Sequence, residues 1–435
     1  MRTLKRPFPV SLNICLMAQK FPILGRATDH SFLWPIATGL VSLGHKVTII
    51  AGKSNLGKPK VERGGVTAYF LMEGSNTNTN TRDSFSKLAL IKFQEIHKQI
   101  PFDLIHSIDN SALLIGEQKE HYRVAVAYDV NATQLVQIIS ILGMTQETVG
   151  SILSTALAVI YKFISTYYRS DRHLLKTANG IFVTNPQHRM MLERYYLFPD
   201  FHIYTVPYGL EIGTLEPRAE DKALKTSLNI PASAQVALTT SEMNEIDEMM
   251  PLLMAFEKVA IKKPNTFLII IGNGPKWKEL EYEILNLVLG RRVLMVGAVK
   301  EQDVPDYISI CDVFINLNTR TTGFESTLIE AMAQEKLVIG SEVSAMANII
   351  EDGVDGFLLR PADSNSLSEL LIDIFSGNIS RGPIGEKARN KVMGFFDAKK
   401  MVTTIINAYY KIINNSGFFK NQSSVSRSIE PDAVH

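Results

Sequence analysis

The sequence predicts an α/β protein in which two Rossmann-like, doubly wound domains face each other across a cleft. Two observations made on the residues alone carry the α/β prediction. Short apolar runs rich in β-branched residues alternate with longer segments of helical pattern throughout the chain. Many of these runs are continuously apolar, as in FLIII and VTII, which is typical of parallel strands covered on both faces. The runs fall into two series of about six, and each series suffices for one doubly wound sheet.

The expected strands follow one another at similar spacing in both halves of the chain. In the first half they are residues 12–18, 46–51, 66–71, 103–108, 124–128, 180–184 and 202–206. In the second half they are residues 235–240, 266–272, 293–299, 312–317, 337–340 and 356–359.

The boundary between the two domains is expected in a polar, charged stretch that separates two apolar strands. This linker, residues 211–232, contains Pro217 and Pro231. The first domain therefore spans residues 1–210 and the second spans residues 233–395. Residues 416–435 lack helical periodicity, and we expect them to form a disordered tail.

Composition excludes several classes of protein. Hydrophobic residues make up 46% of the 435 residues, which is close to the globular average and excludes wholesale disorder. Cys15 and Cys311 lie in separate apolar runs, so a disulfide scaffold is excluded and a reducing, cytoplasmic compartment is favoured. No cluster of ligating residues has metal-site spacing, so neither a metal nor a cofactor is predicted. The formal net charge of +1 argues against a nucleic-acid-binding protein.

Charge is distributed unevenly along the chain. Up to Leu210 there are 22 basic and 14 acidic residues, a balance of +8, and the remainder has 23 basic and 30 acidic residues, a balance of −7. The apolar stretch 149–164 is shorter than a membrane-spanning helix, and we expect a buried or interfacial helix there. A basic amphipathic face beside it would suit the inner face of an anionic membrane, the alternative being an ordinary helix with a solvated charged side. The residues of that face are Ile160, Lys162, Phe163, Tyr167, Tyr168, Arg169, Arg172 and Lys176.

Two glycine-containing loops are candidates for ligand binding, because ligands of doubly wound domains bind beyond the carboxyl ends of the strands. In FPILGRATDH, Gly25 permits close approach of the backbone to a ligand, and Arg26 places a charge before the next helix. In IGNGP, Gly272 and Gly274 form a turn that exposes backbone N–H groups to an anion. Considered alone, the first loop is equally well a turn with a helix cap, and the second an ordinary strand end.

Two further positions follow later strands of the second half. In VGAV, the backbone near Val299 would offer an edge to a nucleotide base. In TTGFESTLIEAMAQ, Glu330 stands in the first turns of a helical run, where it would face the cleft. A glutamate in such a position is more often an ordinary solvated helix residue.

The chain resembles the family 4 glycosyltransferases, which are retaining enzymes of the GT-B fold. The resemblance extends from Leu12 to about Asn415 and is strongest in the second half, through IGNGP, VLMVGAV, ISICDVFINLN, GFESTLIEAMA, VIGSEV and IIEDGVDGFLLRPAD. The first half matches more loosely, through FPILG, GLVSLGHKVTII, FDLIHS and VPYGLE. The resemblance implies a sugar nucleotide in the cleft, and a closing helix, residues 396–415, that crosses back onto the first domain.

The resemblance also implies roles for individual residues. Gly25 would lie beside the phosphate and sugar of the donor, with Arg26 as a replacement cation. Gly272 and Gly274 would form a turn near the nucleotide. The backbone around Val299 would meet the base. Glu330, the second of the two family glutamates, would accept hydrogen bonds from the ribose hydroxyls, which suits a carboxylate.

The chain departs from the family at the positions that bind the diphosphate. The phosphate-binding arginine and lysine of the family fall at Glu242 and Asp247. A departing nucleoside diphosphate carries growing negative charge, which fixed cations stabilise. Two unit charges about 4 Å apart interact by roughly 4 kcal/mol at an effective dielectric of 20, so a change of sign at two positions opposes diphosphate binding.

The catalytic positions also differ from the family pattern. The catalytic-loop histidine falls at Tyr128, before Asp129, and the first of the two glutamates falls at Thr322, with Glu325 three positions later. The expected catalytic candidates are Tyr128, Asp129, His106 and Glu325. The donor-binding set near the second glutamate is completed by Thr322, Gly323 and Phe324.

Three hypotheses remain open from the sequence. The first is an active transferase that moves a sugar from a nucleoside-diphosphate sugar to a glycan or lipid-linked acceptor, with Arg26, Lys276 or Arg320 as replacement cations. The second is a catalytically degraded relative that acts as a partner or regulatory subunit of an active glycosyltransferase in polysaccharide synthesis. The third, ranked last, is another enzyme of the same fold, such as an epimerase or a phosphorylase.

Overall fold

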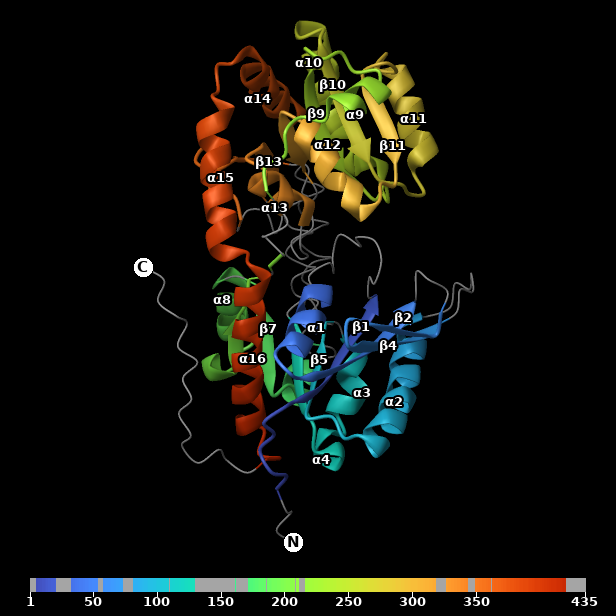
Figure 1. Cartoon of the computed structure of the whole chain (residues 1–435), viewed down its shortest axis with the longest axis vertical. Coiled ribbons are helices and arrows are strands. Elements are labelled where there is room, and N and C mark those ends of the chain that lie inside the picture. Colours follow the sequence, from blue (N-terminus) through green and yellow to red (C-terminus); the bar gives the residue numbers. More distant parts are fainter. Residues whose placement is uncertain are drawn as a thin grey trace.

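The protein consists of two α/β domains, as the sequence predicted (Figure 1). The computed structural model describes residues 5–20, 33–53, 58–72, 81–108, 110–129, 161, 171–184, 186–207, 209–210, 216–317, 326–342, 349–360 and 362–419. All structural statements below concern these residues.

The N-terminal sheet has eight strands in the order β3-β4-β2-β1-β5-β6-β7-β8. All neighbouring strands are parallel except β3, which pairs antiparallel with β4. Their bounds are β1 Asn13–Lys20, β2 Lys46–Lys53, β3 Lys60–Arg63, β4 Val66–Met72, β5 Leu104–Ser107, β6 Ala125–Asp129, β7 Gly180–Val183 and β8 Ile203–Thr205. The sequence did not predict β3, because this short edge strand is charged and mostly exposed and so lacks an apolar run.

The C-terminal sheet has six parallel strands in the order β11-β10-β9-β12-β13-β14. Their bounds are β9 Gln235–Thr240, β10 Thr266–Ile271, β11 Val293–Gly297, β12 Val313–Asn316, β13 Leu337–Ser341 and β14 Phe357–Leu359. The inner strands are almost wholly buried, which explains why their sequences are continuously apolar rather than alternating.

Helices cover both sheets. In the N-terminal domain they are α1 Leu33–Ser42, α2 Thr81–Gln99, α3 Leu113–Gly116, α4 Lys119–Tyr122, α7 Arg172–Thr177 and α8 Pro186–Tyr195. In the C-terminal domain they are α9 Lys222–Ser227, α10 Met250–Lys262, α11 Trp277–Asn286, α12 Val304–Ile310, α13 Ser326–Ala333 and α14 Ser364–Ser376. The 3₁₀ turns are η1 Asn110–Ala112, η4 Asp200–His202, η6 Ile246–Glu248 and η7 Glu301–Asp303. No described helix is long and apolar enough to cross a membrane.

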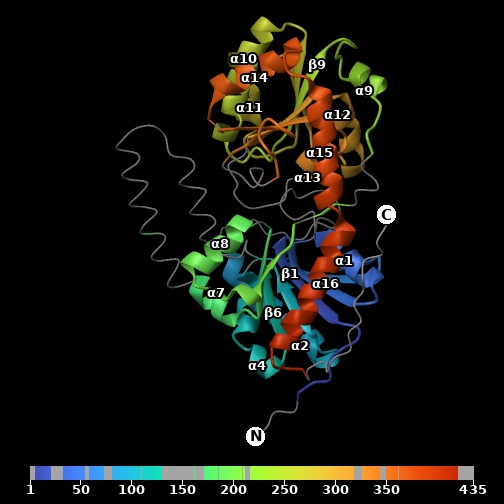
Figure 2. The ribbon, with the colours of Figure 1, turned by 90° about the vertical axis from the view of Figure 1, so that its left-hand side faces the viewer.

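Helices α15 (Arg381–Phe395) and α16 (Ala398–Asn415) form a column along one side of both domains (Figures 1 and 2). The first packs against α13 of the C-terminal domain, and the second packs against α1 of the N-terminal domain. Between α15 and α16 the chain passes beside Leu210, where it first leaves the N-terminal domain. There Leu210 N donates to Phe396 O at 2.9 Å, and Ala398 N donates to Leu210 O at 2.9 Å. Helix α16 therefore lies on the N-terminal domain.

A stripe of apolar residues at helical spacing holds α16 on the N-terminal sheet. Asp397 caps the helix by accepting a hydrogen bond from Lys399 N at 2.8 Å. The buried residues of the helix are Ala398, Met401, Val402, Ile405, Ile406, Ala408, Tyr409, Ile412 and Ile413. Burial of these side chains supplies the free energy that fixes the helix in place, at about 25 cal/mol for each Å² of apolar surface removed from water.

The segment after α16 corrects the predicted boundary of the disordered tail. Phe418 and Phe419 are buried, and Arg6 N donates to Phe418 O at 2.9 Å. The Arg6 guanidinium also lies 4.9 Å from the centroid of the Phe419 ring. Two adjacent aromatic side chains gain enough from burial to order this segment, which the lack of helical periodicity concealed. Residues 420–435 lie outside the described residues.

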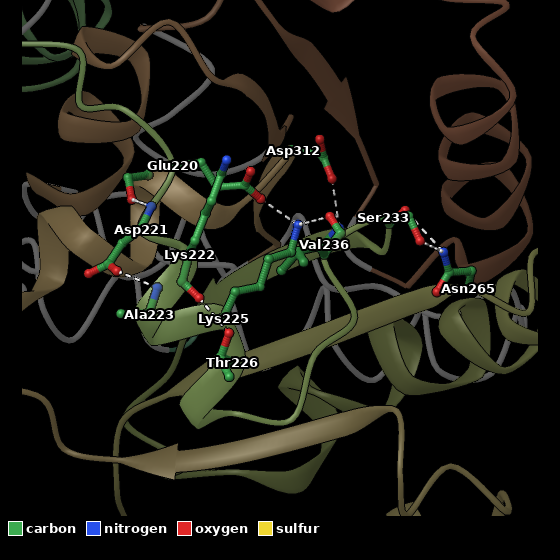
Figure 3. Close-up of polar contacts among 12 residues, drawn as sticks. Glu220, Asp221, Lys222, Ala223, Lys225, Thr226, Ser233, Val236, Asn265 and Asp312 are labelled. Carbon is green, nitrogen blue, oxygen red and sulfur yellow. Dashed lines mark hydrogen bonds and ion pairs between the residues drawn. The ribbon is translucent and has the colours of Figure 1, made fainter.

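A network of polar contacts lies at the amino-terminal end of the C-terminal sheet, opposite the carboxyl ends of its strands (Figure 3). Asp312 Oδ2 accepts from Val236 N at 2.7 Å at the start of β9, and the Asp312 carboxylate also pairs with Arg381 at the start of α15. Lys225 of α9 is buried, pairs with Glu220 and donates to Ala232 O at 3.2 Å. These contacts connect the segment entering the domain to the sheet and to α15.

The side chain of Tyr409 joins α16 to His106 of β5. Its hydroxyl lies 2.7 Å from His106 Nδ1, and both rings pack against Phe182 of β7. His106 Nε2 is buried and has no partner among the described residues. Burial lowers the pKa of His106 to about 3, and burial, together with the charge of Asp129, raises the pKa of Tyr409. Both side chains are therefore neutral in the folded protein at physiological pH.

We expect His106 to make the protein sensitive to acid. Its pKa is lower in the folded protein than its usual value of 6.5, so the unfolded chain binds a proton first as the pH falls. The stabilising contribution of the neutral ring is complete above pH 6.5 and is lost progressively toward pH 3, by about 1.4 kcal/mol per pH unit. Urea unfolding measured from pH 7 to pH 4 should show this slope.

The variant His106→Asn should reduce that slope without abolishing it, because burial also lowers the pKa of His188 to about 4. His121→Asn, a change to an exposed histidine, should leave the slope unchanged. Equal slopes in the wild type and in His106→Asn would show that the acid sensitivity has another source.

Candidate functional site

The candidate site lies at the carboxyl-terminal edge of the C-terminal sheet. There, neighbouring strands end at Gly297, Ile271, Thr240 and Asn316, in the order in which β11, β10, β9 and β12 lie side by side. The loops that follow them are therefore adjacent in space, although they are far apart in the sequence. This is the edge at which ligands of doubly wound domains bind.

Gly272 and Gly274 pack the loop after β10 directly against the loop after β9. A Cβ atom on Gly272 would lie 1.8 Å from Ser241 O, and one on Gly274 would lie 1.8 Å from Glu242 O. Gly272 has a φ of +134° and donates its N–H to Gly297 O at 2.9 Å. Side chains are excluded at both positions by the approach of the neighbouring backbone, so the two glycines of IGNGP are structurally required.

The neighbouring loop, residues 241–248, is acidic. Glu242 is half-buried and accepts a hydrogen bond from Asn244 Nδ2 at 3.0 Å, while Glu245 and Asp247 are exposed. The loop is also tied to the glycine turn, because Lys276 N donates to Met243 O at 3.0 Å. Glu242 and Asp247, to which the resemblance assigns the cation positions of the family, therefore stand near the glycine turn with negative charge.

Lys276 is the cation beside this turn among the described residues. Its Nζ lies 2.8 Å and 3.0 Å from the two carboxylate oxygens of Glu279. The hydrogen bond and charge of Glu279 raise the pKa of Lys276, and the charges of Glu245 and Asp247 raise it further. The ammonium group is thus drawn toward the acidic loop, where it offsets part of the charge on the carboxylates.

Val299 and Glu330 occupy the same domain. Val299 follows β11 and is half-buried against the apolar core. Glu330 lies in α13, the helix that follows β12, and is 1% exposed. A carboxylate this deeply buried is unusual, since burial of a charge is costly unless the charge is hydrogen-bonded. The finding argues against the reading of Glu330 as an ordinary solvated helix residue.

The N-terminal domain contains three candidate residues, Asp129, His106 and Tyr128, and they do not all lie on the same face of its sheet. Asp129 is the last residue of β6 and is buried close to Tyr409, whose pKa it influences. His106 lies beneath α16 on the same face of the sheet. Both residues are therefore covered by the closing helix, a relation that no motif in the sequence revealed.

The structure does not support a chemical role for Tyr128. This residue is fully buried on the opposite face of the sheet, and its hydroxyl lies 3.1 Å from Thr177 Oγ1. The Tyr128 hydroxyl also fills the space beside Gly116, where a Cβ would lie 2.5 Å from it. Successive residues of a strand point to opposite faces, so a residue beside Asp129 faces away from it. We therefore correct the expectation that Tyr128 replaces a catalytic histidine.

Several expected residues lie outside the described residues. They are Gly25, Arg26, Arg320, Thr322, Gly323, Phe324 and Glu325. Most of the expected membrane-facing helix is outside them as well, except that Arg172 and Lys176 are exposed on α7. The roles of these residues stay predictions. No group of three or more metal-ligating side chains occurs in the part of the chain that the structure describes.

Sequence reasoning missed Tyr409 and the carboxylates around Lys276. Tyr409 belongs to the apolar stripe of α16, and a polar tyrosine at a buried helical position is the signal that would have singled it out. Glu245 and Glu279 belong to different segments, so their proximity to Lys276 appears only once the two loops pack together.

Comparison of the sequence with known proteins finds similarity to glycosyltransferases. Residues 221–391 match the family model "Glycosyl transferases group 1". N-acetyl-alpha-D-glucosaminyl L-malate synthase of Bacillus anthracis is 24% identical over 192 residues, which cover 44% of this chain and 49% of that protein. The chain thus spans about half the length of the curated relatives it matches.

Solved structures match over nearly the whole chain. Sucrose-phosphate synthase of Thermosynechococcus elongatus has a TM-score of 0.73 at 18% identity, and the match covers 92% of this chain and 99% of the synthase chain. Anabaena HepE in complex with UDP-glucose has a TM-score of 0.67 at 18% identity and covers 91% and 98%. The resemblance seen in the sequence is thereby confirmed: the chain has the GT-B fold, and its residues 221–391 are similar to the group 1 glycosyltransferases.

Proposed function

We propose that this protein is a glycosyltransferase that takes a sugar from a nucleoside-diphosphate sugar and transfers it to a glycan or lipid-linked acceptor. The observation that carries the proposal is the packing of Gly272 and Gly274 against Ser241 and Glu242 at the carboxyl edge of the C-terminal sheet. This packing brings the glycine turn and the acidic loop together at the edge of the sheet where ligands of doubly wound domains bind. HepE, which shares the fold, is known in complex with UDP-glucose.

In this proposal each half of the site has a separate task. The buried carboxylate of Glu330 accepts hydrogen bonds from the ribose hydroxyls, and the backbone near Val299 meets the base. Asp129, at the carboxyl end of β6, is the ionisable group that the N-terminal domain contributes. Because Asp129 is 1% exposed beneath α16, it would act on the acceptor side through the groups packed around it rather than by contact with the acceptor.

Lys276 would replace the missing cations of the family. Its ion pair with Glu279 is formed between partly exposed side chains, and such pairs contribute little to stability. The ammonium group can therefore leave Glu279 at low cost and bind a diphosphate oxygen. Its place at the start of α11 adds the positive end of the helix dipole to the same region.

A second function is favoured by the acidic loop itself. Glu242, Glu245 and Asp247 stand where a diphosphate would have to enter, and Glu279 holds the neighbouring lysine. If Lys276 does not offset this charge, the domain would bind a donor weakly and the protein would act as a non-catalytic partner of an active glycosyltransferase. The two functions differ in a measurable property, the affinity for a nucleoside-diphosphate sugar.

Calorimetric titration of the full chain with UDP-, GDP- and ADP-sugars tests the proposal, combined with an assay of donor hydrolysis. An active transferase should bind at least one donor with a dissociation constant in the micromolar to millimolar range typical of substrates. Binding without hydrolysis or transfer would favour the partner function. No binding of any donor would contradict the proposed transferase.

For the donor that binds, the variant Lys276→Ala should weaken binding by about tenfold or more, because a charge-assisted hydrogen bond to the diphosphate is lost. Lys278→Ala is the matched control, since Lys278 carries the same charge two positions away and is exposed. Titration of both variants measures the difference. An equal effect of the two changes would show that only the general charge of α11 matters.

Reversal of the charge at positions 242 and 247 should strengthen donor binding. In the double variant Glu242→Arg, Asp247→Lys, two repulsive charges become attractive ones, and we expect a gain in affinity of about tenfold or more. The control Glu281→Arg, Glu369→Lys makes the same change of net charge at two exposed positions outside these loops. An unchanged affinity in the first variant would mean that the side chains at 242 and 247 do not face the diphosphate.

A further inference from the structure

A cavity lies far from the candidate site. It has a volume of about 420 Å³ and is formed where the last turn of α16 meets α8 and the start of β8. The side chains that matter for its chemistry are Arg189, Asp200, Phe201, Tyr204, Lys411 and Asn414. The volume is within the range of small-molecule sites in proteins.

The position of this cavity separates it from the interdomain edge. Helix α16 begins at Ala398, beside the point where the chain crosses between the domains, and runs for 18 residues. At a rise of 1.5 Å per residue, its last turn lies about 25 Å from that crossing. Strand β8 begins at Ile203, so the cavity is at the amino-terminal edge of the N-terminal sheet, opposite the carboxyl ends of its strands.

The hydroxyl of Tyr204 is the first sign that this cavity holds a ligand. Its oxygen is buried and has no hydrogen-bond partner among the described residues. Buried polar groups are almost always hydrogen-bonded, so the hydroxyl of this cavity-lining residue is a group that a bound ligand would satisfy. Burial also raises the pKa of Tyr204, so the hydroxyl keeps its proton and is able to donate.

The end of α16 contributes uncommitted polar side chains. Lys411, Asn414 and Asn415 line the cavity and are exposed, and no described residue forms a hydrogen bond or ion pair with their side chains. Each asparagine amide both donates and accepts, as do the hydroxyls of a sugar. The polar wall therefore matches a ligand that presents several hydroxyl groups.

The charge of the cavity is largely compensated within the protein. Arg189 donates to Glu193 Oε1 at 2.9 Å and pairs with Asp200, so its charge is already balanced by two carboxylates. Lys411 is then the remaining cation on the wall. This balance favours an uncharged ligand over a phosphate or a polyanion, which would require several free cations.

Phe201 supplies an apolar surface beside these polar groups. Its ring is 68% exposed and packs against His202, with 4.2 Å between the ring centroids. His202 is itself fixed by a 2.9 Å contact between Nδ1 and Asn179 O. An exposed aromatic ring held in place next to amide groups can cover the C–H face of a sugar while the amides bind its hydroxyls.

From these contacts we propose that the cavity binds one uncharged sugar ring of a glycan, at a site separate from the donor site. The role of this site rests on the proposed function: for a transferase that extends a glycan, it would hold a distant unit of the acceptor and raise its effective concentration. Binding of the sugar does not depend on that function, because donor, cations and catalytic groups take no part in it.

Saturation-transfer NMR on the full chain without any donor tests the proposal. The probes are the methyl glycosides of glucose, galactose, mannose and N-acetylglucosamine, with inorganic phosphate as the anionic alternative. We expect at least one glycoside to bind and excess UDP to leave it bound. Binding of phosphate alone, displacement by UDP, or no signal from any glycoside would overturn the proposal.

Variants locate the bound sugar. Phe201→Ala and the double change Asn414→Ala, Asn415→Ala should each lower the affinity by about tenfold. Phe395→Ala, which removes a phenylalanine that is 67% exposed on α15, should leave the affinity unchanged. Tyr204→Phe should lower the affinity without lowering the unfolding temperature, because it removes a hydroxyl that has no partner in the described chain. Equal losses in Phe395→Ala and Phe201→Ala would place the sugar elsewhere.

Because the glycoside titration contains no donor, its outcome is independent of the donor titration. A chain that binds glycosides but no nucleotide sugar would retain the distal site and lose the proposed transferase function. A chain that binds and transfers from nucleotide sugars but binds no glycoside would be a transferase without this site.

Discussion

The attachment of α16 to the N-terminal domain is the contact on which the rest of the architecture depends. The chain passes between the domains at Leu210 and returns at Asp397, and the two passages are joined by main-chain hydrogen bonds. From that point the apolar stripe of α16 and the Tyr409–His106 contact fix the helix to the first sheet. This attachment holds α15 and the C-terminal domain that packs on it at one side of the N-terminal domain.

The acidic loop beside the glycine turn shows how a fold and a binding function can be separated. The requirement for glycine at 272 and 274 comes from contact with the backbone of the neighbouring loop and is independent of the side chains that this loop carries. Glu242 and Asp247 can therefore stand at the positions of the family's cations without disturbing the turn. The turn keeps its geometry while the charge around it changes sign, and Lys276 is the group that lessens the effect.

Much of the fold was predictable because it rests on local patterns. Continuous apolar runs such as the one at Thr266–Ile271 predicted buried parallel strands correctly. Strand β3 was missed because its residues are charged, and Phe418 and Phe419 were assigned to a disordered tail because their burial depends on Arg6, at the other end of the described chain. The site was less predictable for the same reason: the orientation of Tyr128, the cover over His106 and the carboxylates around Lys276 all result from contacts between segments distant in sequence.

The pairing of Arg6 with Phe418 and Phe419 bears on the order in which the protein is assembled. The N-terminal domain is built from both ends of the described chain, whereas every strand of the C-terminal sheet lies between residues 235 and 359. During synthesis the C-terminal sheet is therefore complete before α16 has been made. The N-terminal domain is translated first but is completed last, because the apolar face beneath Tyr409 stays uncovered until α16 has been made.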